Sequence, residues 1–202
     1  EFLWDQKPED SVVMLENDGP LILPLESCQK IAQVGGKAIG LANLMAGGFK
    51  VPGGFVVTTI AFQKAGGNEI PPDLAAEILA HYRSLGSPNV AVRSSATNED
   101  LADASMAGQY ETLLDISGEE ELLKAVLQCW QSINTARTRA YLKDKEHPAG
   151  QATMAVVIQE LVNADVAGVM FTEHPEGGAD EILIEANWGL GGAGAQAMLT
   201  DG

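Results

Sequence analysis

Residues 89–97 read Asn-Val-Ala-Val-Arg-Ser-Ser-Ala-Thr, and residues 107–112 read Ala-Gly-Gln-Tyr-Glu-Thr. The first stretch is an apolar run that stops at Arg93, which is typical of a buried strand that brings a guanidinium and two hydroxyls to a sheet edge. A guanidinium is planar and presents paired N–H donors, so it can bind phosphate oxygens two at a time. We therefore expect an anionic ligand near Arg93.

The segments on either side of this strand alternate between helical and extended patterns. Apolar residues at helical spacing predict helices, and apolar or alternating runs between turn residues predict strands. We expect helices over residues 37–46, 73–85 and 118–142, strands over 21–25, 53–58, 89–96 and 111–116, and an antiparallel unit over 154–162, 166–172 and 181–186. The mixture predicts an α+β (mixed α/β) fold.

Three ranges of the chain differ in character. Residues 1–30 predict an irregular N-terminal arm, because prolines and an Asn-Asp-Gly turn interrupt them. Residues 31–88 predict a first subdomain with a Gly-Gly-Lys loop and helices, and residues 89–202 predict the body of the fold. The chain begins without methionine and stops after a glycine-rich stretch, so we expect it to be part of a longer protein.

Composition narrows the class of partner. With 12 Lys and Arg against 28 Asp and Glu, the formal net charge is -16. The surface as a whole therefore repels nucleic acid and anionic lipid, and a phosphate site must be local. No segment approaches the roughly 18 uninterrupted apolar residues of a membrane span. Cys28 and Cys129 lie far apart, which favours buried thiols and a cytoplasmic location over a disulfide framework.

Lys37 follows a glycine pair ahead of an expected helix. Close backbone approach, helix N–H groups and an ammonium suit a phosphate together, although a Gly-Gly-Lys sequence alone is also an ordinary surface turn. Arg93 has an alternative too, because a strand-end arginine often pairs with a surface carboxylate. The acidic residues nearest to it in sequence are Glu99, Asp100 and Asp103.

Six short blocks add specificity to these two residues. The blocks are residues 34–37 (Val-Gly-Gly-Lys), 51–58 (Val-Pro-Gly-Gly-Phe-Val-Val-Thr), 92–97 (Val-Arg-Ser-Ser-Ala-Thr), 107–112 (Ala-Gly-Gln-Tyr-Glu-Thr), 168–172 (Gly-Val-Met-Phe-Thr) and 188–191 (Trp-Gly-Leu-Gly). From about Leu25 to its end, the chain resembles the N-terminal ATP-binding, ATP-grasp-like domain of the phosphoenolpyruvate synthase and pyruvate phosphate dikinase family. The resemblance implies a nucleotide-binding fold that is incomplete at its C-terminal end.

The resemblance assigns five residues to ATP. Lys37 and Arg93 match the family's basic residues that hold the phosphates, and Gly108 and Thr112 match its glycine-rich lid and the strand that follows. Gln159 matches the segment that lines the adenine pocket. A polar residue in a strand can also simply face solvent, so that alternative stands beside the adenine role of Gln159.

The resemblance also implies a reaction that this chain does not complete by itself. The family is a dikinase-type phosphotransferase that moves a phosphoryl group from ATP, with Mg²⁺, to a histidine on a separate swivelling domain and then to an acceptor. No catalytic residue is expected here, because His81, His147 and His174 lack the family's threonine-glycine-glycine lead-in. The family's metal-binding carboxylates are expected beyond residue 202.

Two alternatives stay open. The acceptor is chosen by other domains, so the sequence is equally compatible with an antibiotic phosphotransferase of the rifampicin type. Gly192 stands where the family usually has an acidic residue, which together with the acidic surface leaves room for a non-catalytic nucleotide-binding or interaction module. A phosphohistidine domain and an acceptor domain of the longer chain are the expected partners for the enzymes; nucleic acid and membranes are not.

Overall fold

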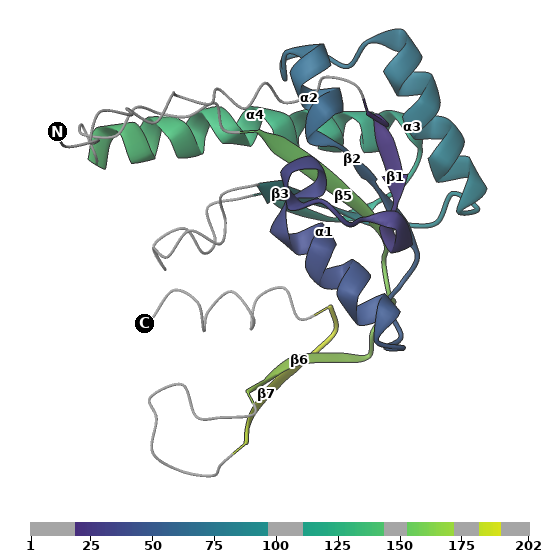
Figure 1. The fold of residues 1–202 in the computed structure, drawn as a ribbon. Helices are drawn as coiled ribbons and strands as arrows, with labels where there is room; N and C mark the ends of the chain where they lie inside the picture. The colour runs from purple at the N-terminus through teal and green to yellow at the C-terminus, as the bar shows by residue number, and fades with distance from the viewer. Residues whose placement is uncertain (1–18, 97–110, 144–152, 172–181, 191–202) are drawn as a thin grey trace, which may run out of the picture.

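The computed structural model describes residues 19–96, 111–143, 153–171 and 182–190 (Figure 1). The helices are α1 (Ile31–Ala46), α2 (Thr59–Ala65), α3 (Pro72–Ser84) and α4 (Glu119–Lys143), with a short 3-10 turn over Leu25–Ser27. The strands are β1 (Ile22–Pro24), β2 (Gly54–Val57), β3 (Val90–Ala96), β4 (Thr112–Ile116), β5 (Met154–Glu160), β6 (Val166–Phe171) and β7 (Leu183–Trp188). This mixture confirms the α+β prediction.

Five of the strands form one antiparallel sheet in the order β1-β2-β5-β3-β4, and β6 pairs with β7 alone. The predicted antiparallel unit of the last third is therefore wrong in one respect, because β5 leaves it and joins the larger sheet. The arginine strand β3 lies inside this sheet, between β5 and β4, and not at its edge. The sheet takes strands from all three predicted ranges, and the division at residues 30 and 88 stays a prediction.

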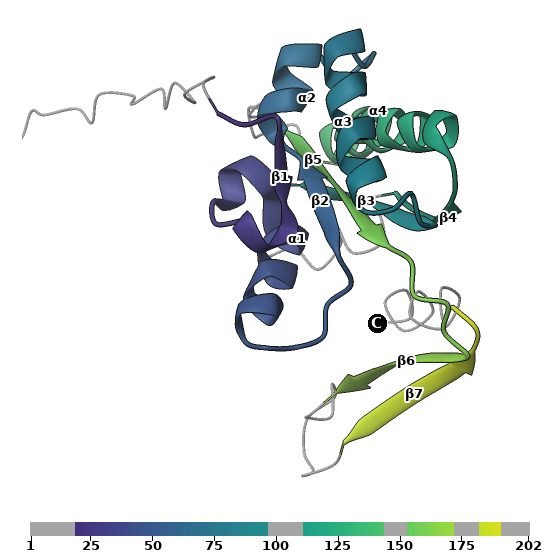
Figure 2. The same ribbon diagram turned by 90° about the vertical axis from the view of Figure 1, so that its right-hand side faces the viewer.

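Helices cover both faces of the five-stranded sheet. α1 packs on one face against a small core that includes Val56, Ala155 and Val157. α2, α3 and α4 cover the other face, where the larger core includes Phe55, Val156 and Trp130. Figures 1 and 2 show α1 and α4 on opposite sides of the strands. We call these the α1 face and the α4 face of the sheet.

Local sequence explains how these elements begin and end. The whole of β5 is apolar up to Gln159, which suits a central strand covered on both sides. Thr58 caps α2 by accepting a hydrogen bond from the Ala61 N–H at 3.4 Å, and Gly66 ends the helix at a φ of 71° that glycine adopts without strain. The predicted strands and helices therefore form close to where the sequence places them.

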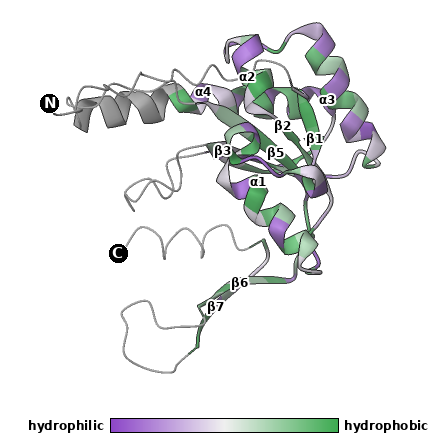
Figure 3. Cartoon of the chain, in the orientation of Figure 1, coloured by the Kyte–Doolittle hydropathy of each residue, from purple (hydrophilic) through white to green (hydrophobic). Residues whose placement is uncertain are grey.

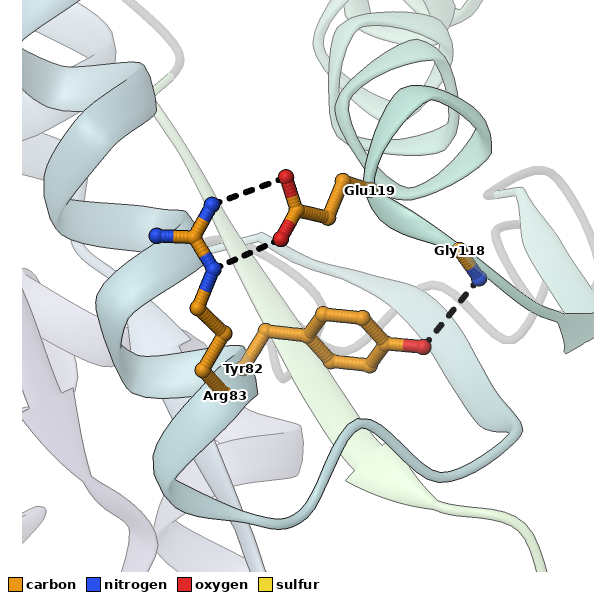
Figure 4. Close-up of polar contacts among 4 residues, drawn as sticks. All are labelled: Tyr82, Arg83, Gly118 and Glu119. Atoms are coloured by element: carbon orange, nitrogen blue, oxygen red, sulfur yellow. Dashed lines mark hydrogen bonds and ion pairs between the residues drawn. The ribbon is translucent and has the colours of Figure 1, made fainter.

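Tyr82 and Arg83 join α3 to the start of α4 (Figure 4). The buried Tyr82 hydroxyl donates to the Pro88 carbonyl at 2.9 Å and accepts from the Gly118 N–H at 3.2 Å. The Arg83 guanidinium donates two hydrogen bonds to the Glu119 carboxylate, at 2.6 and 2.8 Å. Tyr82 thus satisfies two backbone groups in the protein interior, and Arg83 forms an ion pair at the surface.

The β6–β7 hairpin lies apart from the larger sheet in both views (Figures 1 and 2). Its cross-strand pairs Val166–Trp188, Gly168–Ala186 and Met170–Ile184 place apolar residues together on one face. Trp188 is 88% exposed, and Figure 3 shows hydrophobic residues on both strands. Within the part of the chain that the structure describes, no helix has the length and apolar character needed to cross a membrane.

Candidate functional site

Polar residues gather on the α1 face of the sheet, next to α1. Arg93 of β3 lies directly opposite Thr112 of β4 on one side and Val157 of β5 on the other. Directly opposed residues of an antiparallel sheet share a face, so Thr112 and Arg93 share the face that Val157 presents to α1. Arg93 is half-buried and Thr112 is exposed. The structure therefore brings these two predicted site residues together.

Gln159 lies on the same face, two residues beyond Val157. It pairs with Ala91 of β3 and Gly54 of β2, and its side-chain Nε2 donates to the Pro52 carbonyl at 3.2 Å. Only 7% of Gln159 is exposed, so the solvent-facing alternative is wrong for this residue. Its amide group ties the end of β5 to the segment that enters β2, while the amide oxygen keeps acceptor capacity.

Lys37 reaches this face from α1. Its Nζ donates to the Ser94 carbonyl at 2.9 Å, across 57 positions of sequence. The glycine pair before it does not form the loop predicted ahead of the helix, since α1 already begins at Ile31 and Gly35 lies inside it with a φ of 73° and a ψ of 170°. The pair instead bends the helix, and the bend brings Lys37 beside β3.

The two serines after Arg93 have different environments, contrary to the expectation that both hydroxyls serve one ligand. Alternation along a strand turns Ser94 toward the α4 face, where its hydroxyl donates to the Glu111 carbonyl at 3.0 Å. Ser95 shares the α1 face with Arg93 and is fully buried. Among the described residues, three buried side-chain atoms lack a hydrogen-bond partner: Arg93 Nε, Ser95 Oγ and Trp130 Nε1.

Both cysteines have raised thiol pKa values, and the Lys37 ammonium affects that of Cys129 across β3. Burial raises the pKa of the Cys129 thiol to about 12, the Glu111 carboxylate adds to this rise, and the Lys37 ammonium opposes it. Burial likewise raises the pKa of Cys28 to about 11. Both cysteines are free and buried, as the sequence predicted, and both stay protonated at neutral pH. Neither thiol is a nucleophile in this site.

Several expected participants fall outside the described ranges. Gly108, the carboxylates of Glu99, Asp100 and Asp103, and Gly192 belong to segments 97–110 and 191–202. His147 and His174 also lie outside, whereas His81 is half-buried on α3 with its ring 5.4 Å from that of Phe55. Within 19–96, 111–143, 153–171 and 182–190, no group of three or more His, Cys, Asp or Glu residues could hold a metal ion.

The α1 face therefore carries donors for an anion. Lys37 and Arg93 supply positive charge, Thr112 and Ser95 supply hydroxyls, and the bend at Gly35 brings helix backbone close to them. The prediction of a loop at the glycine pair did not include this bend. The signal that could have revealed it is the apolar periodicity that continues from Ile31 through the glycine pair. These donors suit phosphate oxygens and not a divalent cation.

Comparison with known proteins identifies the kind of domain. Residues 65–201 match the AMP/ATP-binding domain of pyruvate phosphate dikinase. The chain belongs to this family. Arg93, Gly108, Thr112 and Gln159 lie within the match to the dikinase domain, while Lys37 precedes it. The family resemblance predicted from the six sequence blocks is confirmed.

Individual relatives of this dikinase-domain chain are much longer proteins. It is 39% identical to phosphoenolpyruvate synthase of Aeropyrum pernix over 217 aligned residues, which cover 85% of this chain and 26% of that protein. It is 40% identical to phosphoenolpyruvate synthase of Pyrococcus furiosus over 139 residues, which cover 65% of this chain and 17% of that protein. The chain thus spans about a quarter or less of the two relatives.

Proposed function

We propose that the α1 face binds the phosphates of ATP, with Lys37 and Arg93 as the principal cations and with Thr112 and Gly108 beside them. The observation that carries the proposal is the meeting of the two cations at one strand. Lys37 hydrogen-bonds to the Ser94 carbonyl, immediately next to Arg93, whose Nε is buried without a partner. An unpaired buried guanidinium N–H is costly, and a phosphate oxygen would satisfy it.

The nucleotide base lies toward Gln159 in this proposal. Gln159 and Arg93 share the α1 face on adjacent strands, so a nucleotide could extend along the sheet from one to the other. The Gln159 Nε2 is engaged with the Pro52 carbonyl, which leaves its oxygen to accept from the adenine amino group. Adenine specificity would come from this oxygen and from backbone groups after β5.

The complete reaction requires a longer protein. The relatives are named phosphoenolpyruvate synthases, and the domain family is that of a dikinase, which supports phosphoryl transfer from ATP to a histidine on a separate domain. A phosphohistidine domain and an acceptor domain would be the partners, and the cytoplasm the location. Mg²⁺ would offset charge on the transferring phosphates. The described residues provide no ligand set for it, so we assign none.

Isothermal titration of ATP with Mg²⁺ tests the phosphate site. We expect Lys37→Ala and Arg93→Ala each to weaken ATP binding about ten- to a hundredfold, because each removes a charged hydrogen-bond donor. Lys124→Ala and Arg83→Ala are matched controls. Lys124 of α4 pairs with Glu120 and Glu121, and Arg83 of α3 pairs with Glu119 of α4. They change the net charge equally.

The controls separate a local site from long-range attraction. With a net charge of -16, removal of any cation could weaken ATP binding slightly. If all four variants lose affinity alike, the effect is general electrostatics and the assignment of Lys37 and Arg93 is wrong. If neither the unmodified chain nor the longer parent chain binds ATP, the nucleotide site itself is contradicted.

A further inference from the structure

The bend in α1 rests directly on β3. A Cβ atom placed on Gly35 would lie 2.4 Å from both the carbonyl oxygen and the hydroxyl oxygen of Ser95. Real side chains do not approach so closely, and the φ of 73° also disfavours any residue but glycine. The bend and Ser95 are therefore in immediate contact, and only a glycine permits it.

The bend also starts a second helical segment. Gly35 has a φ of 73° and a ψ of 170°, which are not helical, and it lies between two helical stretches. Residues 36–46 therefore form a helix with its own beginning. The first N–H groups of a helix have no carbonyl partner within the helix and carry partial positive charge. Lys37 belongs to this first turn and contacts the Ser94 carbonyl.

Ser95 is the second observation at this helix start. Its side chain is fully buried on the α1 face, two residues from Arg93, and its hydroxyl has no hydrogen-bond partner. The neighbouring Ser94 hydroxyl, by contrast, donates to the Glu111 carbonyl. A buried hydroxyl without a partner costs folding free energy, and alanine would fill nearly the same space without that cost. The hydroxyl is therefore suited to a partner that arrives from outside.

We propose that Ser95 is a further phosphate-binding residue, which the Gly35 bend covers in the free chain and uncovers when a phosphate chain binds. This inference rests on the proposed ATP site. A shift of the flexible glycine bend would let the hydroxyl donate to a phosphate oxygen beside the Arg93 guanidinium. The free chain would then carry an unpaired hydroxyl that the ligand satisfies.

This role predicts opposite effects on stability and on affinity. Ser95→Ala should leave the melting temperature of the free chain unchanged or raise it, because the lost hydroxyl has no partner. The same variant should bind ATP and inorganic triphosphate about tenfold or more weakly. Ser132→Ala is the matched control, since its hydroxyl donates to the Cys129 carbonyl at 2.7 Å on α4. It should leave both affinities unchanged.

Calorimetric titration and thermal denaturation of these chains give the test. Ser95→Cys serves as a second, nearly isosteric variant whose weak thiol donor should restore only part of the affinity. Equal binding by Ser95→Ala and the unmodified chain would overturn the role of Ser95 while the ATP site stands. A loss of affinity accompanied by an equal loss of stability would assign Ser95 a structural role instead. If neither the unmodified chain nor the longer parent chain binds ATP or triphosphate, the ATP site fails and this inference fails with it.

Discussion

The two faces of the five-stranded sheet differ in how their polar groups are satisfied. On the α4 face, the buried Tyr82 hydroxyl contacts two backbone groups and the Ser94 hydroxyl contacts a third. On the α1 face, the Arg93 Nε and the Ser95 hydroxyl are buried without partners. A protein interior normally pairs such groups. The α4 face therefore stabilises the fold, and the unpartnered groups support the proposal that the α1 face holds donors for a ligand.

The contrast has one exception, which is itself informative. Trp130 is fully buried on the α4 face, and its indole N–H has no hydrogen-bond partner. Its ring meets that of Phe62 nearly at right angles, with centroids 5.7 Å apart. Such edge-to-face contacts are favourable in themselves. Trp130 therefore contributes through its packing. We expect substitutions on the α4 face to alter stability while ATP affinity stays constant.

The largest stability effect is expected at Trp130. Trp130→Ala should destabilise the chain by about 3–5 kcal/mol, because it removes a large buried side chain and leaves a cavity. Trp130→Phe keeps an aromatic ring and removes the unpaired N–H, so its cost should be clearly smaller. Urea denaturation measures both. A loss in the phenylalanine variant that approaches the loss in Trp130→Ala would mean that the indole N–H has a partner in solution.

Local pattern predicted most of the elements and some of the site. The apolar runs of β3 and β5 and the amphipathic spacing of Leu74, Ile78 and Tyr82 depend on nearest neighbours in sequence. The side to which each serine points follows from strand alternation, so the separation of Ser94 from Ser95 was within reach of the sequence. The two cations came from motif resemblance together with local chemistry.

Other features depend on long-range packing that local sequence does not specify. β5 pairs with β2, from which it is separated by about half of the chain, and nothing in its own residues distinguishes that partner from β6. The bend at Gly35 lies against Ser95, sixty positions later, so close that a Cβ atom would not fit. Gln159 was predicted at the adenine side, and its hydrogen bond to Pro52 comes from the same long-range pairing.

An intermediate effect is expected at Tyr82. Tyr82→Phe keeps the ring in the core but leaves the Pro88 carbonyl and the Gly118 N–H without their shared partner. Loss of partners for buried groups should cost about 1–3 kcal/mol. Urea denaturation gives the stability change, and ATP titration should show no change in affinity. If Tyr82→Phe also weakens ATP binding, the conclusion that the α4 face affects stability alone is wrong.

The smallest effect is expected at the exposed Arg83–Glu119 pair. The hydrogen bond from Arg83 holds the pKa of the Glu119 carboxyl below its ordinary value of 4.5. A carboxyl with a lowered folded-state pKa adds stability above that ordinary value and loses it as pH falls through the lowered one. Glu119→Gln should therefore destabilise the chain at neutral pH by less than Tyr82→Phe, and the difference from the unmodified chain should vanish in strong acid.

A double-mutant cycle with Arg83→Gln separates the pair from the other contributions of Glu119. Glu119 also lies in the acidic first turn of α4, where a carboxylate interacts favourably with the helix dipole. The coupling between the two substitutions isolates the ion pair, and it should shrink with added salt because both side chains are about half exposed. A coupling that persists in high salt would mean that the Arg83–Glu119 pair is more shielded from solvent than its exposure indicates. The pair would then belong with the stabilising contacts of the α4 face.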